Sequence, residues 1–160
     1  MPMREVRLFN RCVGSRVEAR RFCRLARLLL EEELGLSSYV LHVRLVGTEE
    51  ITTLNERFVK HAGATDVITF DYSSGGGPGG LHSDLVICLD EVARQARRYH
   101  TGRGSELARC LVHGVLHLRG YRDGRPVQRR RMKRAEGRLL RRLARRFPLS
   151  QLTPKTRLRS

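Results

Sequence analysis

The residues best suited to chemistry are two histidines, His113 and His117, which stand four positions apart in a segment of helical pattern. Positions i and i+4 of a helix lie on one face, so both imidazoles could bind one metal ion. Gly120 follows, and a glycine in the left-handed conformation can end a helix and turn the chain sharply. That turn could bring Asp123 back as a third ligand. Three protein ligands with an open fourth position are typical of a catalytic zinc site.

Ordinary structural roles offer another explanation for these residues. The two histidines could be ordinary residues of a packed helix. That helix is apolar on nearly all sides, which predicts burial, and two buried imidazoles need partners, of which a metal ion would be one. Asp123-Gly124 is also a common turn pair. Gly114 stands where metallopeptidases with an H-E-x-x-H motif carry a catalytic glutamate, which argues against a peptidase of that kind. The metal interpretation is favoured over two ordinary helix histidines.

The segment His113–Asp123 resembles the signature of the YbeY family, bacterial metal-dependent endoribonucleases that act on ribosomal RNA. The family pattern is H-G-x-L-H-L-x-G-Y-D-H, and the chain matches it as far as Tyr121. Arg122 then replaces an aspartate, and Asp123 replaces the third histidine. Asp is an accepted zinc ligand, and an oxygen donor shifts the preference toward harder ions. The resemblance implies one zinc ion, or another divalent metal, held by His113, His117 and Asp123.

Two further segments extend the resemblance over roughly residues 6–143. The segment 54–70 is similar to the family's L-N-x-x-[YF]-R-x-x-x-x-x-T-[ND]-V-L-S-F, and 84–88 is similar to its G-[DE]-I-x-I strand. Val59 stands where the family has an arginine that is thought to handle RNA. We expect neighbouring basic residues to supply that charge instead.

Positive charge is concentrated in the second half of the chain. The net charge is +16, and residues 97–160 carry 20 of the 32 lysines and arginines but only three acids. This indicates a polyanionic partner, although a solvated basic face is the plainer alternative. With aromatic residues at 6%, we favour contacts to the RNA backbone over base stacking. The candidates for RNA contact are Lys60, His61, Arg119, Arg122, Arg130 and Arg134.

The hydrophobic pattern predicts one small α/β domain with a four-stranded mixed sheet and about five helices. Strands are expected at 6–10, 39–46, 65–72 and 85–89, and helices at 16–34, from 48 onward, 91–100, 106–119 and 126–146. The first strands should be parallel and the last two should form a hairpin, with the histidine helix packed on the sheet. Thr48, Asp90 and Ser105 are candidate N-caps. The domain should span residues 1–148, followed by a basic, flexible tail at 149–160.

The sequence indicates neither a membrane-spanning segment nor an oxidising compartment, and the resemblance, rather than the composition, disfavours a membrane surface as a partner. The four cysteines show no C-x-x-C spacing, which favours reduced, buried thiols. No apolar run approaches the ~18 residues of a membrane span, and the N-terminus does not resemble a signal peptide. We expect a cytoplasmic protein.

The resemblance to the YbeY family therefore implies a metal-dependent endoribonuclease specific for single-stranded RNA. The resemblance implies maturation of the 3′ end of small-subunit ribosomal RNA and ribosome quality control, with the small ribosomal subunit and assembly factors as partners and no DNA. Metal-bound water is the proposed nucleophile, attack by the RNA 2′-hydroxyl is another route, and the catalytic side chains are unknown. Two alternatives are a non-catalytic RNA-binding assembly factor with a structural metal, and a metallohydrolase of another substrate.

Overall fold

A four-stranded mixed sheet forms the centre of the computed structural model, which describes residues 2–12, 14–59, 66–73 and 80–154. The strands lie side by side in the order β1 (Arg4–Asn10), β2 (Ser38–Val46), β4 (Gly80–Cys88) and β3 (Val67–Asp71). β1, β2 and β4 are parallel, and β3 is antiparallel to β4. The predicted mixed sheet, its parallel first strands and its antiparallel last pair are confirmed.

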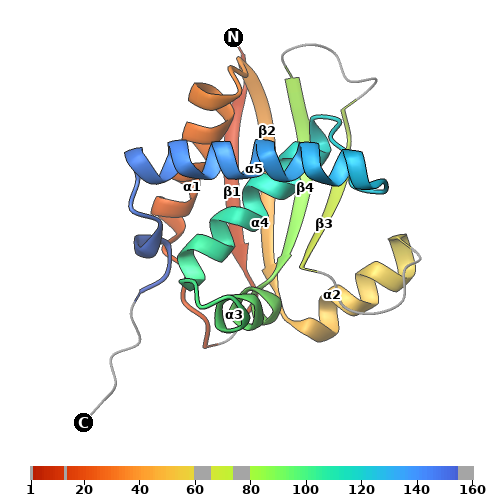
Figure 1. Cartoon of the computed structure of the whole chain (residues 1–160), viewed down its shortest axis with the longest axis vertical. Helices are drawn as coiled ribbons and strands as arrows, with labels where there is room; N and C mark the ends of the chain where they lie inside the picture. Colours follow the sequence, from red (N-terminus) through yellow and green to blue (C-terminus); the bar gives the residue numbers. More distant parts are fainter. Residues whose placement is uncertain (1, 13, 60–65, 74–79, 155–160) are drawn as a thin grey trace.

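Five α-helices surround the sheet in the described part of the chain, as predicted. They are α1 (Ala19–Arg27), α2 (Thr48–Leu54), α3 (Leu89–Arg98), α4 (Arg103–Leu118) and α5 (Pro126–Arg146), with π-helical turns η1 (Leu28–Glu33) and η2 (Asn55–Val59) continuing α1 and α2. Figure 1 shows α4 lying between the sheet and α5, which crosses in front of it. The helix that carries both histidines is therefore the central layer of this side of the protein.

The alternation of apolar residues along the strands decides which face each helix covers. Tyr39, Leu41 and Val43 of β2 are buried in the main core, which they share with α1, α4 and α5. Val86 of β4 points to the opposite face and packs with Ile51 of α2 in a second, smaller cluster. Since successive strand side chains alternate between faces, one sheet can support both layers.

The helix starts differ from the predicted caps. Thr48 is the first residue of α2 rather than its N-cap, and its N–H and hydroxyl donate to Asp90 Oδ2 over 2.8 and 3.0 Å. Asp90 lies in the first turn of α3, whose N-cap is Cys88, and its side chain binds the start of α2, because β2 and β4 are neighbours and end side by side. α4 begins at Arg103, two residues before the predicted cap Ser105.

The segment predicted as a tail begins with a short 3-10 helix, η3 (Leu149–Leu152). Leu152 is fully buried, and its carbonyl accepts a hydrogen bond from the Glu18 N–H over 2.8 Å. Gly104 permits the close approach of η3 to α4, because a Cβ at this position would collide with the Leu149 carbonyl. Residues 149–152 are therefore packed against the domain.

Two remaining expectations concern compartment. Within the described residues, no helix combines the length and the apolar character needed to cross a membrane. All four cysteines are free thiols: Cys88 and Cys110 are buried, and Cys12 and Cys23 are partly exposed. Burial raises the pKa of the Cys110 thiol, and the nearby Asp66 carboxylate raises it further.

Candidate metal centre

Close packing of α4 on the sheet determines where the histidines lie. A Cβ at Gly114 would overlap the Leu85 side chain and stand 3.2 Å from Val67 Cγ1. Because there is no room for a side chain here, the glutamate that follows the first histidine in H-E-x-x-H peptidases could not be accommodated. His113 and His117 lie on the flank of α4, with 24% and 28% of their side chains exposed.

The end of α4 is capped by the predicted glycine turn. Gly120 has φ +99°, in the left-handed region. The Tyr121 N–H donates to the Leu116 carbonyl over 3.0 Å, and the Gly120 N–H donates to the His117 carbonyl over 3.1 Å. These two hydrogen bonds are those of a Schellman motif. The motif reverses the chain and returns the following residues to the histidine face of α4.

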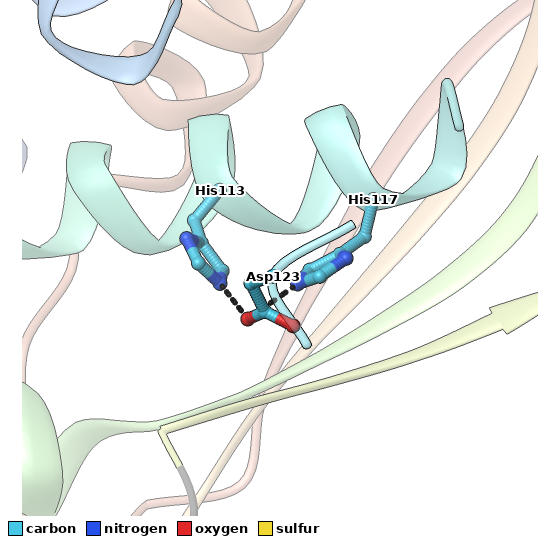
Figure 2. A group of neighbouring side chains, drawn as sticks. All are labelled: His113, His117 and Asp123. Atoms are coloured by element: carbon cyan, nitrogen blue, oxygen red, sulfur yellow. Dashed lines mark ion pairs between the residues drawn. The ribbon is translucent and has the colours of Figure 1, made fainter. Parts of the chain in front are cut away.

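The reversed chain brings Asp123 to both histidines, as Figure 2 shows. Its Oδ2 lies 3.3 Å from His117 Nε2 and 3.9 Å from His113 Nε2. The ligand atoms of the three residues all lie within 4.8 Å of one another. Tetrahedral zinc with bonds of about 2.1 Å separates its ligands by ~3.4 Å. The donor set therefore fits a divalent ion after a small closure, and Asp123, half exposed, leaves the cluster open to solvent.

The second nitrogen of each imidazole is also engaged. His117 Nδ1 lies 3.0 Å from the Tyr121 carbonyl oxygen, and His113 Nδ1 lies 2.8 Å from Glu136 Oε2. A carbonyl or carboxylate oxygen accepts and does not donate, so both Nδ1 atoms carry the hydrogen. The Nε2 atom of each imidazole faces Asp123 and is therefore the nitrogen available as a metal ligand.

Sequence reasoning missed Glu136, and it also missed Arg109, whose Nη1 lies 3.9 Å from Glu136 Oε1. Glu136 is the only acid between Pro126 and Arg146, and it borders the apolar stripe that contains Met132. A lone carboxylate next to a buried stripe, amid many arginines, is a sequence signal that could have singled it out.

The expected RNA-contact residues lie beside the cluster rather than in it. Arg119 and Arg122 line a depression of about 320 Å³, and Arg130 and Arg134 line one of about 430 Å³. The two depressions share Tyr121 and Arg131. Lys60 and His61 fall outside the described residues. One contact of a cation with the ligand turn was not predicted: Arg129 Nη1 donates to the Asp123 carbonyl over 3.4 Å.

The protein is thus a small α/β protein with a candidate mononuclear metal centre, in which three potential ligand atoms converge at the end of α4. A family profile described as Endoribonuclease YbeY matches residues 12–144. The chain belongs to the YbeY endoribonuclease family.

Similar proteins agree with this assignment. An Endoribonuclease YbeY from Anaeromyxobacter sp. (strain Fw109-5) is 41% identical over 136 residues, which cover 85% of this chain and 70% of that protein. Another, from Chlorobium luteolum, is 36% identical over 123 residues, covering 77% and 87%. The solution structure of a Thermotoga maritima protein has a TM-score of 0.61 at 23% identity and covers 96% of this chain and 100% of that one, which shows a likeness of fold.

Proposed function

We propose that this protein is a metal-dependent endoribonuclease that cuts single-stranded RNA at a zinc ion held by His113, His117 and Asp123. The convergence of two imidazole Nε2 atoms and one carboxylate, in a chain of the YbeY endoribonuclease family, carries the proposal. Zinc bound there would supply Lewis-acid chemistry, activating a water or polarising a phosphoryl oxygen of the RNA. The protein's part is to orient the ligands and to leave the remaining coordination position open.

Basic residues around Tyr121 would hold the RNA backbone. Arg119 and Arg122 on one side, and Arg130 and Arg134 on the other, line adjoining depressions next to the ligand turn. Guanidinium groups bind phosphate through paired hydrogen bonds, and such phosphate contacts do not discriminate between bases. Lys60 and His61 are proposed as further contacts.

Membership of the family supports a proposal for the biological setting. The proposed substrate is ribosomal RNA, at the 3′ end of the small-subunit molecule, in maturation and ribosome quality control. The small ribosomal subunit and its assembly factors are the proposed partners, in the cytoplasm. The net charge of +16 supports a polyanionic partner of this kind.

Cleavage of a labelled single-stranded RNA from the small-subunit 3′ end tests the function. Metal-loaded protein, chelated protein and His117→Ala are purified in parallel and compared. Cuts that disappear with chelation and with the substitution would support the proposal. Equal cutting by all three would assign the activity to a contaminant, and tight binding without cutting would favour a non-catalytic assembly factor.

The RNA surface is tested separately through salt dependence. The logarithm of the association constant for single-stranded RNA should fall linearly with the logarithm of the salt concentration, with a slope of about −0.7 for each phosphate contact. The double variant Arg130→Gln/Arg134→Gln should flatten the slope by up to ~1.4. Arg141→Gln/Arg145→Gln is the matched control, since it makes the same charge change on exposed positions of α5 outside both depressions. Equal effects of both variants would count against a localised RNA surface.

A further inference from the structure

The two candidate ligand histidines are held in place in different ways. His117 uses the main-chain carbonyl of Tyr121, which the helix cap already positions. His113 instead uses the side chain of Glu136, which comes from α5, 23 residues away in sequence. The orientation of one ligand therefore depends on its own helix end, and that of the other depends on a neighbouring helix.

Glu136 also belongs to a partly buried network of charges centred on Arg109. Arg109 Nη1 lies 3.9 Å from Glu136 Oε1, which is the carboxylate oxygen that does not bind His113. The same guanidinium binds Asp66 and Glu106 over 2.9 Å each. Only 13% of the Glu136 side chain is exposed. A carboxylate restrained at both oxygens has little freedom to turn away from the imidazole.

The arrangement keeps Arg109 charged. Burial by itself would lower the pKa of this guanidinium, but the hydrogen bonds that it donates to the carboxylates of Glu106 and Asp66 raise it overall. Arg109 stands on α4 one turn before His113, so the cation and the histidine share a helix face. Asp66, just before β3, attaches this face to the sheet.

We propose that Glu136 is the positioning residue of the metal centre, because it holds the Nδ1 hydrogen of His113 and so keeps the Nε2 lone pair directed at the ion. Arg109 keeps the Glu136 carboxylate in place. This inference rests on the proposed metal centre at His113. A carboxylate partner also strengthens an imidazole as a ligand, and loss of such a partner typically weakens metal binding about 10–100-fold.

Two substitutions separate hydrogen bonding from charge. Glu136→Gln retains an oxygen that can accept from Nδ1, whereas Glu136→Ala removes the acceptor. Both leave Arg109 its other two carboxylate partners, Asp66 and Glu106. Glu33→Ala is the matched control, because Glu33 is at least as buried and also pairs with α5, but through Arg142 over 2.8 Å rather than through a histidine.

The first measurement is the zinc dissociation constant of the full chain by chelator competition. Glu136→Ala should bind zinc about 10–100-fold more weakly, Glu136→Gln should lie between it and wild type, and Glu33→Ala should match wild type. A folded Glu136→Ala protein with wild-type affinity would overturn the proposal. So would an equal loss in Glu33→Ala, because the effect would then be one of general stability.

The second measurement needs no metal. Long-range ¹H–¹⁵N correlation spectra of the metal-free protein report which imidazole nitrogen carries the hydrogen. His113 should be the Nδ1–H tautomer in wild type and should lose this preference in Glu136→Ala, while His117 should be unchanged. An Nε2–H tautomer at His113 in wild type would refute the role of Glu136. A wild-type protein that binds no zinc but shows the expected tautomer would instead refute the proposed metal centre.

Discussion

Gly114 allows a stability prediction whose sign is opposite to the usual rule. Replacing glycine by alanine inside a helix normally stabilises the helix by ~1 kcal/mol. Here the new methyl would overlap Leu85 Cδ1 and stand 3.3 Å from Leu85 Cδ2. Leu85 is 0% exposed, so it has no free space to move into. Overpacking costs about 1–3 kcal/mol, and a direct overlap with a fully buried side chain belongs to the upper part of that range, at about 2–3 kcal/mol. We expect Gly114→Ala to destabilise the protein by ~1–2 kcal/mol in balance.

Thermal and urea unfolding of the metal-free protein measure this effect. The expected loss corresponds to a decrease in Tm of about 2–8 °C for a chain of this size. Gly137→Ala is the matched control, since a Cβ there meets only the flexible end of Arg141, at 3.3 Å, and should stabilise α5 by up to ~1 kcal/mol. Leu85→Val should relieve part of the loss in a double variant, because it removes both crowding atoms. If Gly114→Ala were as stable as wild type, the close packing inferred for α4 would be incorrect.

Three further outcomes are expected. Gly104→Ala should detach η3, because the new Cβ would collide with the Leu149 carbonyl, and should lower the free energy of unfolding in urea by about 1–3 kcal/mol. Unchanged stability together with unchanged protease resistance near Leu149 would contradict this. Asp123→His should raise the ratio of zinc to manganese affinity, measured by competition, because nitrogen is a softer donor than oxygen; a lower ratio would argue against Asp123 as a ligand. Cys110 should react with iodoacetamide only after unfolding, because its raised pKa keeps the buried thiol protonated, whereas Cys23 should react faster in the native protein; equal native rates would refute the assigned burial.

Much of the fold could be predicted because burial imposes a regular pattern on the sequence. Tyr39, Leu41 and Val43 alternate along β2 because one face of the strand meets the core. Pro126 and Pro148 mark the limits of α5, and its predicted range agrees with the observed one. The role of Asp90 could not be predicted in this way, since it depends on which strands are neighbours.

In the candidate site, too, local relations between residues could be predicted and contacts between distant segments could not. His113, His117 and Asp123 could be recognised together because helical spacing and one glycine turn relate them locally. Glu136 could be singled out as the one carboxylate among the arginines of α5, but its contact with His113 could not be predicted, because that contact depends on how α5 is rotated and shifted against α4. The arginines of α5 illustrate the same limit, because their spacing indicated only a basic surface. The packing of the helix shows that Arg130 and Arg134 line the depression of about 430 Å³. It also shows that Arg129 contacts the turn that carries Asp123.

The cap at Gly120 also has a consequence for the order of folding. The three ligand residues lie within eleven consecutive positions, and main-chain hydrogen bonds close the turn between them. The entropy cost of closing a loop grows with its length, so this unit can assemble early and cheaply. The contact from Glu136 spans a longer stretch of chain and forms only when α5 docks. The proposed metal ion would join α4 and its turn as a local unit, and we expect the arginine-rich helix α5 to pack onto that unit afterwards.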